Sequence, residues 1–348
     1  MLLTDRYPTF FAPHHAALAA LGWELRVSGT MRERVAALGR SGLLRLTANG
    51  PDARGIALAR YGLAYHDAFS DLALIIQELG SWPLAQVPGF EAEVEDARAG
   101  RAVTVFALTE PDAGSDVRNI TTRAERAGDG FRLTGVKHFI SNAPEADRAT
   151  VFARLGEKVA CFLVERPHTE AQKVAGHSIG RVLLSHTPAR LVAERGLPLA
   201  LGTLDRCRPT VGAAALGMAR RAIDETVTHL KTRQQFGAPL AHLPVVQLRV
   251  AEMALDWETA MLATLHACWR RDTAAQTERT GYESAIGKVA ATEAAGRIVD
   301  RAVQLHGGLG VDEDHVVQQL YRDLRPLRIY EGATDVLLTL IAQTWLEG

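Results

Sequence analysis

One carboxylate near the carboxyl end of the chain, Glu331, has the setting of a proton acceptor. Apolar and aromatic residues precede it, among them Leu327 and Tyr330, and Gly332 follows it directly. A small residue after the acid would let a flat ligand approach the backbone closely. An apolar setting makes a carboxylate harder to keep charged, which raises its affinity for a proton. The residue alone fits an exposed glutamate before a turn equally well, so the assignment depends on other parts of the chain.

A second candidate segment is 108–117, with the sequence LTEPDAGSDV, which joins an expected strand to a turn. Its Pro, Gly, Ser and Asp residues favour a tight loop with exposed backbone N–H groups. Such a loop can bind an anion or the polar edge of a planar ring. An ordinary connecting loop would have the same composition, so this segment does not decide the function alone.

Three further segments could contact a cofactor. In GVKHFISNA, 135–143, Phe139 could cover the face of a ring, or it could belong to the core. In RQQFGAPL, 233–240, Arg233 could pair with a phosphate, or it could interact with the dipole at a helix end. In QLHGGLG, 304–310, the paired glycines could approach a diphosphate, or they could cap a helix.

Composition excludes several classes of protein. The chain has 348 residues, which predicts two or three domains or layers. Its formal net charge of -1, without a long run of one sign, argues against a nucleic-acid binder. No apolar run is long enough to span a bilayer, and the N-terminus lacks the basic region of a signal peptide. Three cysteines without metal-site spacing, Cys161, Cys207 and Cys268, fit a reduced interior, so we expect a cytoplasmic protein without a metal site.

The elements that must position these segments begin with helices. Within residues 1–102, apolar residues recur three and four apart over 31–43 and 57–79, which is typical of amphipathic helices. Helix breakers at 49–51 (Asn-Gly-Pro) and at 82–83 (Trp-Pro) interrupt this pattern. The sequence therefore predicts an N-terminal region of several helices.

Strands and then long helices follow. Residues 103–200 contain short β-rich runs separated by glycine turns, as at 128–130, and they predict a small antiparallel sheet or barrel. The pattern of the last third, 171–200, indicates no clear element. Residues 201–348 carry the apolar stripes of long helices, which pack as an antiparallel bundle.

Taken together and in this order, these segments resemble the acyl-CoA dehydrogenase family of flavoproteins. The combination consists of TEPDAGSD, RQQFG, QLHGGLG and a terminal YEG, and the resemblance extends from about residue 103 to 346 and, more weakly, to the N-terminal helices. It implies an α+β fold, mainly α, with an N-terminal helical domain (1–102), a middle antiparallel β domain (103–200) and a C-terminal four-helix bundle (201–348). It also implies FAD as the cofactor, held between the middle and C-terminal domains.

The resemblance assigns site residues one by one, with Glu331 as the catalytic base. Positions that contact or cover the flavin ring are matched by Leu108, Thr109, Ser115, Phe139 and Ser141. Contacts to the rest of FAD are matched by Arg233, Phe236, Gln247, Gln304, Gly307 and Gly308, with Thr334 one position after the usual threonine. Positions near the substrate are matched by Arg208, Tyr330 and Gly332.

The implied reaction converts a saturated acyl thioester into its 2,3-enoyl thioester. Glu331 would remove the α-proton, and the β-hydrogen would leave as a hydride to flavin N5. Fixed donors, including the Glu331 backbone N–H, would stabilise the enolate-like charge as it develops. Some relatives carry the base at the position of Cys207, so Glu331 is the candidate here. The resemblance also implies electron-transfer flavoprotein, or a similar acceptor, and a homodimer or homotetramer, because a neighbouring subunit supplies the diphosphate contacts.

The chain departs from the family pattern at three places, all on the acyl or carrier side of the site. Segment 81–102 is short, segment 178–199 is trimmed, and 336–338 (Val-Leu-Leu) replaces the usual Ile-x-Arg. Short relatives in natural-product gene clusters act on acyl groups tethered to carrier proteins, so the substrate could be an acyl-CoA or an acyl carrier protein thioester. A flavin oxidase or monooxygenase on the same scaffold, and a catalytically silent homologue, are the other hypotheses.

Overall fold

The computed structural model describes residues 2–47, 52–174, 177–275 and 280–347. The chain forms two compact units, each discontinuous in sequence. Unit 1 comprises Met1–Arg26, Pro51–Ala68 and Arg208–Gly348, and unit 2 comprises Val27–Gly50 and Phe69–Cys207. Helix accounts for 61% of the chain, which confirms a mainly helical fold with a sheet region. The three-domain division at residues 102 and 200 stays a prediction.

Four helices belong mainly to unit 2. They are α3 (Met31–Arg40), α4 (Leu43–Thr47), α6 (Ala68–Ala85) and α7 (Glu91–Arg98). A capping box formed by Thr30 and Glu33 starts α3, because each side chain accepts a hydrogen bond from the other residue's backbone N–H. The predicted break at Trp82-Pro83 is wrong, since α6 continues to Ala85. Pro83 lies in the last turn of α6, and burial of Leu84 there favours continuing the helix despite the missing N–H. The predicted break at 49–51 lies outside the described residues.

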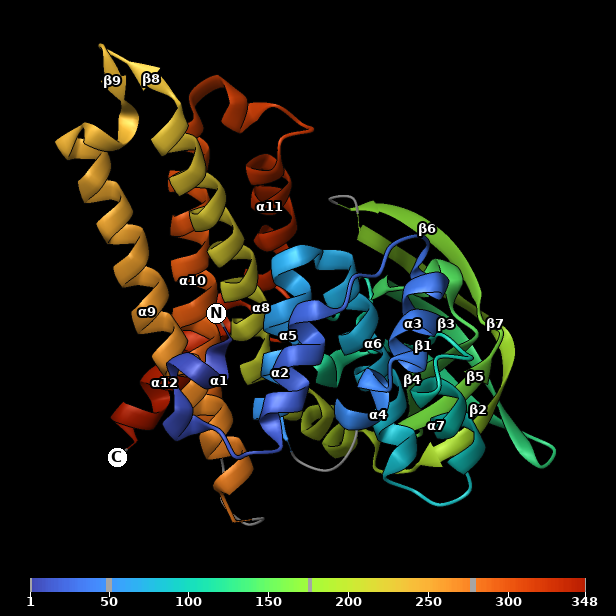
Figure 1. The fold of residues 1–348 in the computed structure, drawn as a ribbon. Helices are drawn as coiled ribbons and strands as arrows, with labels where there is room; N and C mark the ends of the chain where they lie inside the picture. Colours follow the sequence, from blue (N-terminus) through green and yellow to red (C-terminus); the bar gives the residue numbers. More distant parts are fainter. Residues whose placement is uncertain (1, 48–51, 175–176, 276–279, 348) are drawn as a thin grey trace. The chain divides into compact units, whose positions relative to one another are not determined.

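Seven strands of unit 2 form one sheet. They are β1 (Thr104–Ala107), β2 (Arg123–Ala127), β3 (Gly130–Ser141), β4 (Arg148–Leu155), β5 (Lys158–Glu165), β6 (His168–Val174) and β7 (His177–Ala193). The strand order is β1-β4-β2-β3-β7-β5, with β6 paired to β7. Because β5 also pairs with β4, the strands β4-β2-β3-β7-β5 close on themselves as in a barrel. The green strands of Figure 1 show this curved arrangement.

The sheet is mixed, so the prediction of an antiparallel β domain is wrong where β1 and β2 pair with β4. Strand β1 runs parallel to β4, with Thr104 opposite Arg148, and β2 meets β4 in parallel at Arg123 and Arg154. The other named pairs of the sheet are antiparallel. A parallel pair needs a long connection, and the β2–β3 hairpin supplies it between β1 and β4. Such non-local pairing leaves no mark on the local alternation of side chains.

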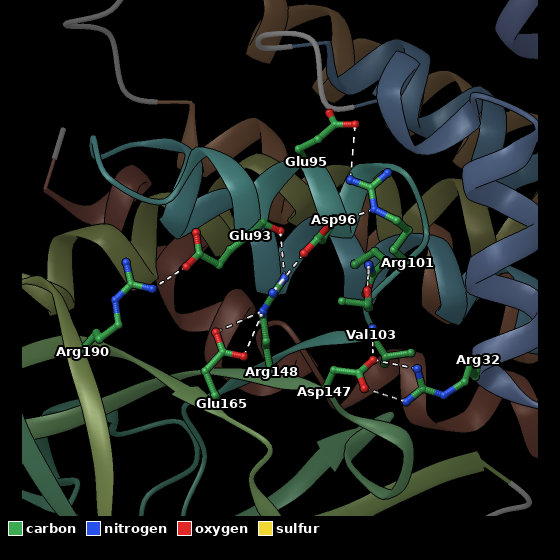
Figure 2. Close-up of polar contacts among 12 residues, drawn as sticks. Arg32, Glu93, Glu95, Asp96, Arg101, Val103, Asp147, Arg148, Glu165 and Arg190 are labelled. Carbon is green, nitrogen blue, oxygen red and sulfur yellow. Dashed lines mark hydrogen bonds and ion pairs between the residues drawn. The ribbon is translucent and has the colours of Figure 1, made fainter.

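Ion pairs join α7 to the sheet in unit 2 (Figure 2). Arg148 of β4 reaches Asp96 of α7 at 3.0 Å and Glu165 of β5 at 3.1 Å. Arg190 of β7 pairs with Glu93 of α7. Exposed pairs of this kind contribute up to about 1 kcal/mol each. Their role is therefore to set the position of α7 on the sheet more than to stabilise the unit.

Long helices dominate unit 1. Its elements are α1 (Leu3–Arg6), α2 (His15–Glu24), α5 (Ala53–His66), most of α8 (Gly196–Thr232), the short strands β8 (Gln234–Gln235) and β9 (Ala238–Pro239), α9 (Pro244–Thr273), α10 (Gly281–His306), α11 (Val316–Leu324) and α12 (Thr334–Leu346). Helices α9 and α10 run side by side (Figure 1), as the predicted bundle requires. Their buried faces carry Trp257 and Met261 of α9 and Ile298 of α10. No helix in the described ranges is both long and apolar enough to cross a bilayer.

Candidate active site

The turn between η6 (Arg325–Arg328) and α12 holds Glu331 in a left-handed backbone conformation. The φ angle is 54° at Glu331 and 107° at Gly332. A residue other than glycine pays of order 1–3 kcal/mol for such an angle, and it persists only where the surroundings impose it. Two cations supply that constraint from two helices. Arg208 Nε of α8 donates to the Glu331 carbonyl oxygen at 3.0 Å, and Lys288 Nζ of α10 donates to the Gly332 carbonyl oxygen at 2.6 Å.

A further side chain, Glu293 of α10, holds both ends of the same turn. The Glu293 carboxylate accepts a hydrogen bond from Arg328 Nε at 2.8 Å, at the start of the turn. It also accepts from Thr334 Oγ1 at 2.8 Å, at the first residue of α12. The predicted site residues Arg208, Glu331 and Thr334 are thus brought together on one side of α10. Thr334 was expected to contact the dinucleotide. In this structure its hydroxyl group donates a hydrogen bond to Glu293.

Three of the predicted site residues share an unusual backbone geometry. Phe139, Phe236 and Glu331 each have a φ of 54°, and only six described residues other than glycine have a positive φ. Strained backbone of this kind gathers at ligand and catalytic sites, where the position of one side chain matters. The structure therefore marks these three positions, together with Asn142, Arg166 and His186, independently of their sequence motifs.

In unit 2, a buried ion pair supports the loop 108–117. Lys137 Nζ of β3 lies 2.7 Å from Glu110 Oε1 and also donates to the Leu108 carbonyl oxygen at 3.0 Å. Glu110 further accepts from the backbone N–H groups of Thr121 and Thr122. Burial raises the pKa of the Glu110 carboxyl, but the charge and hydrogen bond of Lys137 outweigh it and lower that pKa to about 2. Burial lowers the pKa of Lys137 to about 8, although Glu110 opposes this shift.

That support places the predicted flavin contacts of the loop at the end of β1. Leu108 is buried directly after the strand, and Thr109 accepts a hydrogen bond from the His138 N–H at 2.8 Å through its carbonyl oxygen. Ser115 is exposed at the tip of the loop. Buried contacts therefore hold the start of the loop, and its tip is exposed to solvent. The motif alone could not show this.

Phe139 and Ser141 lie at the end of β3. The pairing of β3 with β7 shifts register between Lys137 and Ile140, and this irregularity turns the Phe139 ring outward. Phe139 is 54% exposed, so the alternative that it is a core residue is wrong. Next to Ser141, the buried carboxamide of Asn142 has no hydrogen-bond partner among the described residues. The exposed Phe139 ring is suited to contact with a planar ligand.

A second group of predicted residues lies at one end of the helices of unit 1. The His229 ring of α8 stacks on the His306 ring of α10 at 4.5 Å, so the ends of these helices are adjacent. The exposed residues of this end are Arg233, Phe236, Gln247, Gln304, Gly307 and Gly308. The Phe236 ring is 91% exposed, and a Cβ atom placed on Gly307 or Gly308 would meet no atom within 4 Å. This end of the unit is therefore an open surface.

The two groups in unit 1 are far apart along α10. The Glu331 turn contacts α10 at Lys288, whereas Gly307 and Gly308 follow its last residue, His306. Eighteen residues separate Lys288 from His306, which corresponds to about 27 Å along a helix axis. One bound molecule could thus not place its ring next to Glu331 and its diphosphate next to Gly307 of the same copy of the chain.

Sequence reasoning missed a cavity in unit 2. It has a volume of about 460 Å³ and is lined by Arg118, Arg154, Glu157, Lys158, Val159, Glu194, Arg195, Leu197 and Pro198. Arg154 donates to the carbonyl oxygens of Ile120 and Arg118, whereas Lys158 and Arg195 form no ion pair with any described residue. Four cations against two carboxylates make the lining suited to an anion. Arg118 follows the TEPDAGSD motif closely, and this was the signal that could have found the cavity.

The supporting residues Glu110, Lys137, Lys288 and Glu293 were also missed. Lys137, Lys288 and Glu293 are charged residues inside patterns that otherwise predict a strand or a helix, and Glu110 lies in the loop 108–117. A lysine on a face of buried residues, as at 137 and 288, was the available signal, since lysine is almost never fully buried without a partner.

Comparisons with known proteins match two domains of this chain. The description "Acyl-CoA dehydrogenase, middle domain" matches residues 105–187, and "Acyl-CoA dehydrogenase, C-terminal domain" matches residues 194–346. The 3-(aryl)acrylate reductase of Clostridium sporogenes is 34% identical over 266 residues, which cover 71% of this chain and 70% of that protein. The cyclohexane-1-carbonyl-CoA dehydrogenase of Geobacter metallireducens is 33% identical over 307 residues, with 82% and 80% covered.

A solved structure shows the same fold. The glutaryl-CoA dehydrogenase of Mycobacterium smegmatis in complex with FADH2 superposes with a TM-score of 0.89 at 23% identity, over 99% of this chain and 97% of that one. At that identity the likeness concerns the fold, while the sequence relatives and the matched domains establish the family. The chain belongs to the acyl-CoA dehydrogenase family, whose members are FAD-dependent oxidoreductases.

Proposed function

We propose that this protein dehydrogenates an acyl-CoA thioester with FAD, and that Glu331 is the base that takes the α-proton. The observation that carries the proposal is the strained Glu331 turn, which Arg208 and Lys288 hold from two different helices. A backbone angle that costs free energy is kept where the placement of the side chain matters. Proton abstraction needs such placement, because a base works only within hydrogen-bond reach of the proton it removes.

The residues present fit FAD. Two exposed aromatic rings, Phe139 and Phe236, offer faces for an isoalloxazine ring and for an adenine. The accessible Ser115 offers a polar partner on the loop 108–117. The open glycine pair at 307–308 and the exposed Arg233 suit a diphosphate. FAD, when bound, would supply the acceptor for the β-hydrogen as hydride at its N5 atom.

In the reaction, the residues of this chain hold the base in place and favour its ionised form. Arg208 and Lys288 bring two cations to the turn that carries the Glu331 carboxylate. Cations near a carboxylate favour its charged form, which is the form that accepts a proton. The same carboxyl group, once protonated, could return the proton to the α-carbon. The turn therefore serves both directions of the reaction, which fits the reductase name of the Clostridium sporogenes relative.

The cavity of unit 2 supports an anionic acyl carrier. Coenzyme A carries several phosphate charges, and Arg118, Lys158 and Arg195, which line the cavity, form no ion pair with any described residue. The cavity adjoins the loop 108–117, where the flavin contacts are proposed. An acyl carrier protein, whose prosthetic arm has one phosphate, stays a prediction. Butyryl-CoA and butyryl-loaded acyl carrier protein, assayed side by side, distinguish the two carriers by kcat/KM.

A homodimer is part of the proposal. The separation of about 27 Å between Lys288 and His306 along α10 argues that the diphosphate contacts serve the flavin of a second copy. Helix α9 presents an exposed apolar stripe on which a second copy can pack.

Electron-transfer flavoprotein is the proposed acceptor of the electrons, and the cytoplasm is the proposed location. Turnover with oxygen alone would favour the oxidase hypothesis instead.

The deciding experiment replaces Glu331 by Gln. The purified FAD-loaded variant and wild type are mixed anaerobically with butyryl-CoA and with cyclohexane-1-carbonyl-CoA, and the loss of flavin absorbance is followed. We expect flavin reduction to slow by about a hundred to ten-thousand-fold, the usual contribution of a general base, with FAD content unchanged. Glu313→Gln, an exposed change in the same unit, is the matched control. Wild-type rates of reduction in Glu331→Gln would refute the assignment of the base.

A further inference from the structure

We propose that Lys288 is a positioning residue for Glu331, and that it acts in two ways. Its buried ammonium group fixes the turn through the Gly332 carbonyl, and its charge attracts that of the Glu331 carboxylate. This inference rests on the proposed role of Glu331 as the base. Lys288 acts on the turn through the Gly332 carbonyl, so it is a positioning residue and not a catalytic one.

The geometry of Lys288 is that of a built-in clamp. Its side chain is 0% exposed on α10, although lysine is almost never buried without a partner. Among the described residues its hydrogen-bond acceptor is the Gly332 carbonyl oxygen, at 2.6 Å. That carbonyl belongs to the residue directly after Glu331, where φ is 107°. Losing this bond would release the peptide on which the left-handed conformation of Glu331 depends.

The clamp of Lys288 is distinct from the contacts that Glu293 and Arg208 make. Glu293 holds the ends of the turn at Arg328 and Thr334, and Arg208 holds the carbonyl of Glu331 itself. Lys288 alone holds the glycine. Removing it should therefore leave the ends of the turn in place and loosen its centre, an outcome that a general loss of stability would not produce.

The charges around Lys288 show why it also acts on the Glu331 carboxyl. Glu331 faces it from the turn, Glu293 from its own helix, Arg208 from α8 and Arg328 from η6. Glu293 and Arg328 form an ion pair with each other, so their charges largely cancel. Of the remaining charges, that of Glu331 attracts Lys288 and that of Arg208 repels it. The attraction between Lys288 and Glu331 favours the charged forms of both groups.

Burial gives Lys288 a further property. It lowers the pKa of the ammonium to about 8, although the charge of Glu331 opposes the shift. The group is still positively charged at neutral pH. A structural lysine could have its pKa lowered in the same way, so the test needs a measurement that follows the base and another that follows the turn.

The test replaces Lys288 by Met, which has a similar length but neither charge nor donor. The FAD-loaded variant is reduced anaerobically with butyryl-CoA over a range of pH, and the acid limb of the rate profile is compared with wild type. We expect that limb to move upward by about one pH unit, because the carboxyl loses a neighbouring cation. Hydrogen exchange, followed by mass spectrometry, should become at least tenfold faster at 329–333 while 316–324 stays unchanged. Lys231→Met, exposed at the end of α8, is the control.

The second variant, Lys288→Arg, keeps the charge and changes the shape of the donor. It should leave the acid limb near its wild-type position and raise exchange of the turn. An unchanged acid limb and unchanged exchange in Lys288→Met would overturn the proposal. If Lys288→Met does not fold, Lys288→Arg decides, and wild-type exchange at 329–333 in that variant contradicts the clamp. Failure of the Glu331 assignment is seen separately, since Glu331→Gln would then reduce its flavin normally whatever the exchange data show.

Discussion

Lys137 Nζ and Glu110 Oε1 lie 2.7 Å apart in the interior of unit 2, and they connect β3 to the loop that follows β1. The same ammonium group reaches the Leu108 carbonyl oxygen, so one buried cation holds the loop at two points. A buried ion pair contributes little net stability, but removal of one partner leaves the other charge unpaired in a dry environment. The pair therefore acts as a lock on the loop 108–117 and on the proposed flavin contact at Ser115.

Replacing Lys137 by Met should destabilise the protein strongly. The expected loss is about 3–5 kcal/mol in the free energy of unfolding, because Glu110 would remain buried and charged. The double variant with Glu110→Gln should recover a large part of that loss, since the unpaired charge is then gone. Urea unfolding measures both values, and Lys173→Met, on the exposed side of β6, is the control. A single variant as stable as wild type would show that the pair does not lock the loop.

The same pair predicts a dependence of stability on pH. The pKa of Glu110 is about 2 in the folded protein and near 4.5 for an ordinary glutamate, so the unfolded chain binds this proton more readily. Its contribution to stability is complete above pH 4.5 and is lost as the pH falls toward 2. The difference in unfolding free energy between wild type and Glu110→Gln should therefore shrink over this interval. A difference that is constant with pH would contradict the lowered pKa.

Gly332→Ala should disturb the Glu331 turn without creating a cavity in the core. The residue has a φ of 107°, and an added Cβ atom would lie 2.9 Å from Leu337 Cδ2. We expect a loss of about 1–3 kcal/mol in stability and a slower reduction of the flavin, because both the backbone angle and the contact are unfavourable to alanine. Gly202→Ala on α8, where no atom lies within 4 Å, should be neutral or stabilising. Thermal unfolding and anaerobic reduction compare the two variants, and equal effects would argue against strain at residue 332.

The elements that the sequence predicts well are those set by neighbouring residues. The hairpin between β2 and β3 follows from alternation on both sides of Gly128, whose φ of 59° requires a flexible residue. The parallel pairing of β1 with β4 was missed because nothing within either strand specifies its partner. The helix break predicted at Pro83 was wrong because burial along α6 outweighs one lost hydrogen bond. Local signals thus describe turns and helix faces better than they describe sheet topology.

The candidate site divides in the same way. Glu331 stands out in the sequence because glycine and aromatic residues flank it. Lys288 does not, because its acceptor, Gly332, lies 44 residues later in the chain. A lysine on an alanine-rich helix resembles an exposed residue until the fold brings the turn against it. Phe139 is a related case, since a register shift between two distant strands decides whether its ring is buried or exposed.

The exposed face of α9 gives the last prediction. Leu248, Leu255, Leu262 and Trp269 are all exposed and lie seven residues apart, which places them along one side of the helix. A continuous apolar stripe of this length is unfavourable in water and suits contact with a second copy of the chain. A carboxylate in its centre would be buried unpaired in such a contact.

Leu255→Glu should therefore weaken the dimer. Leu255 is 66% exposed in the single chain, and we expect the dissociation constant to rise about a hundredfold, since an unpaired buried carboxylate costs about 3 kcal/mol. Sedimentation over a range of concentrations measures the change. FAD content should fall with the dimer, because the proposed diphosphate contacts come from the second copy. Leu46→Glu, at a leucine of α4 that is 42% exposed, is the matched control and should change neither property. A Leu255→Glu variant that remains dimeric would place the interface elsewhere, and a monomer that keeps its FAD would show that one chain holds the whole cofactor.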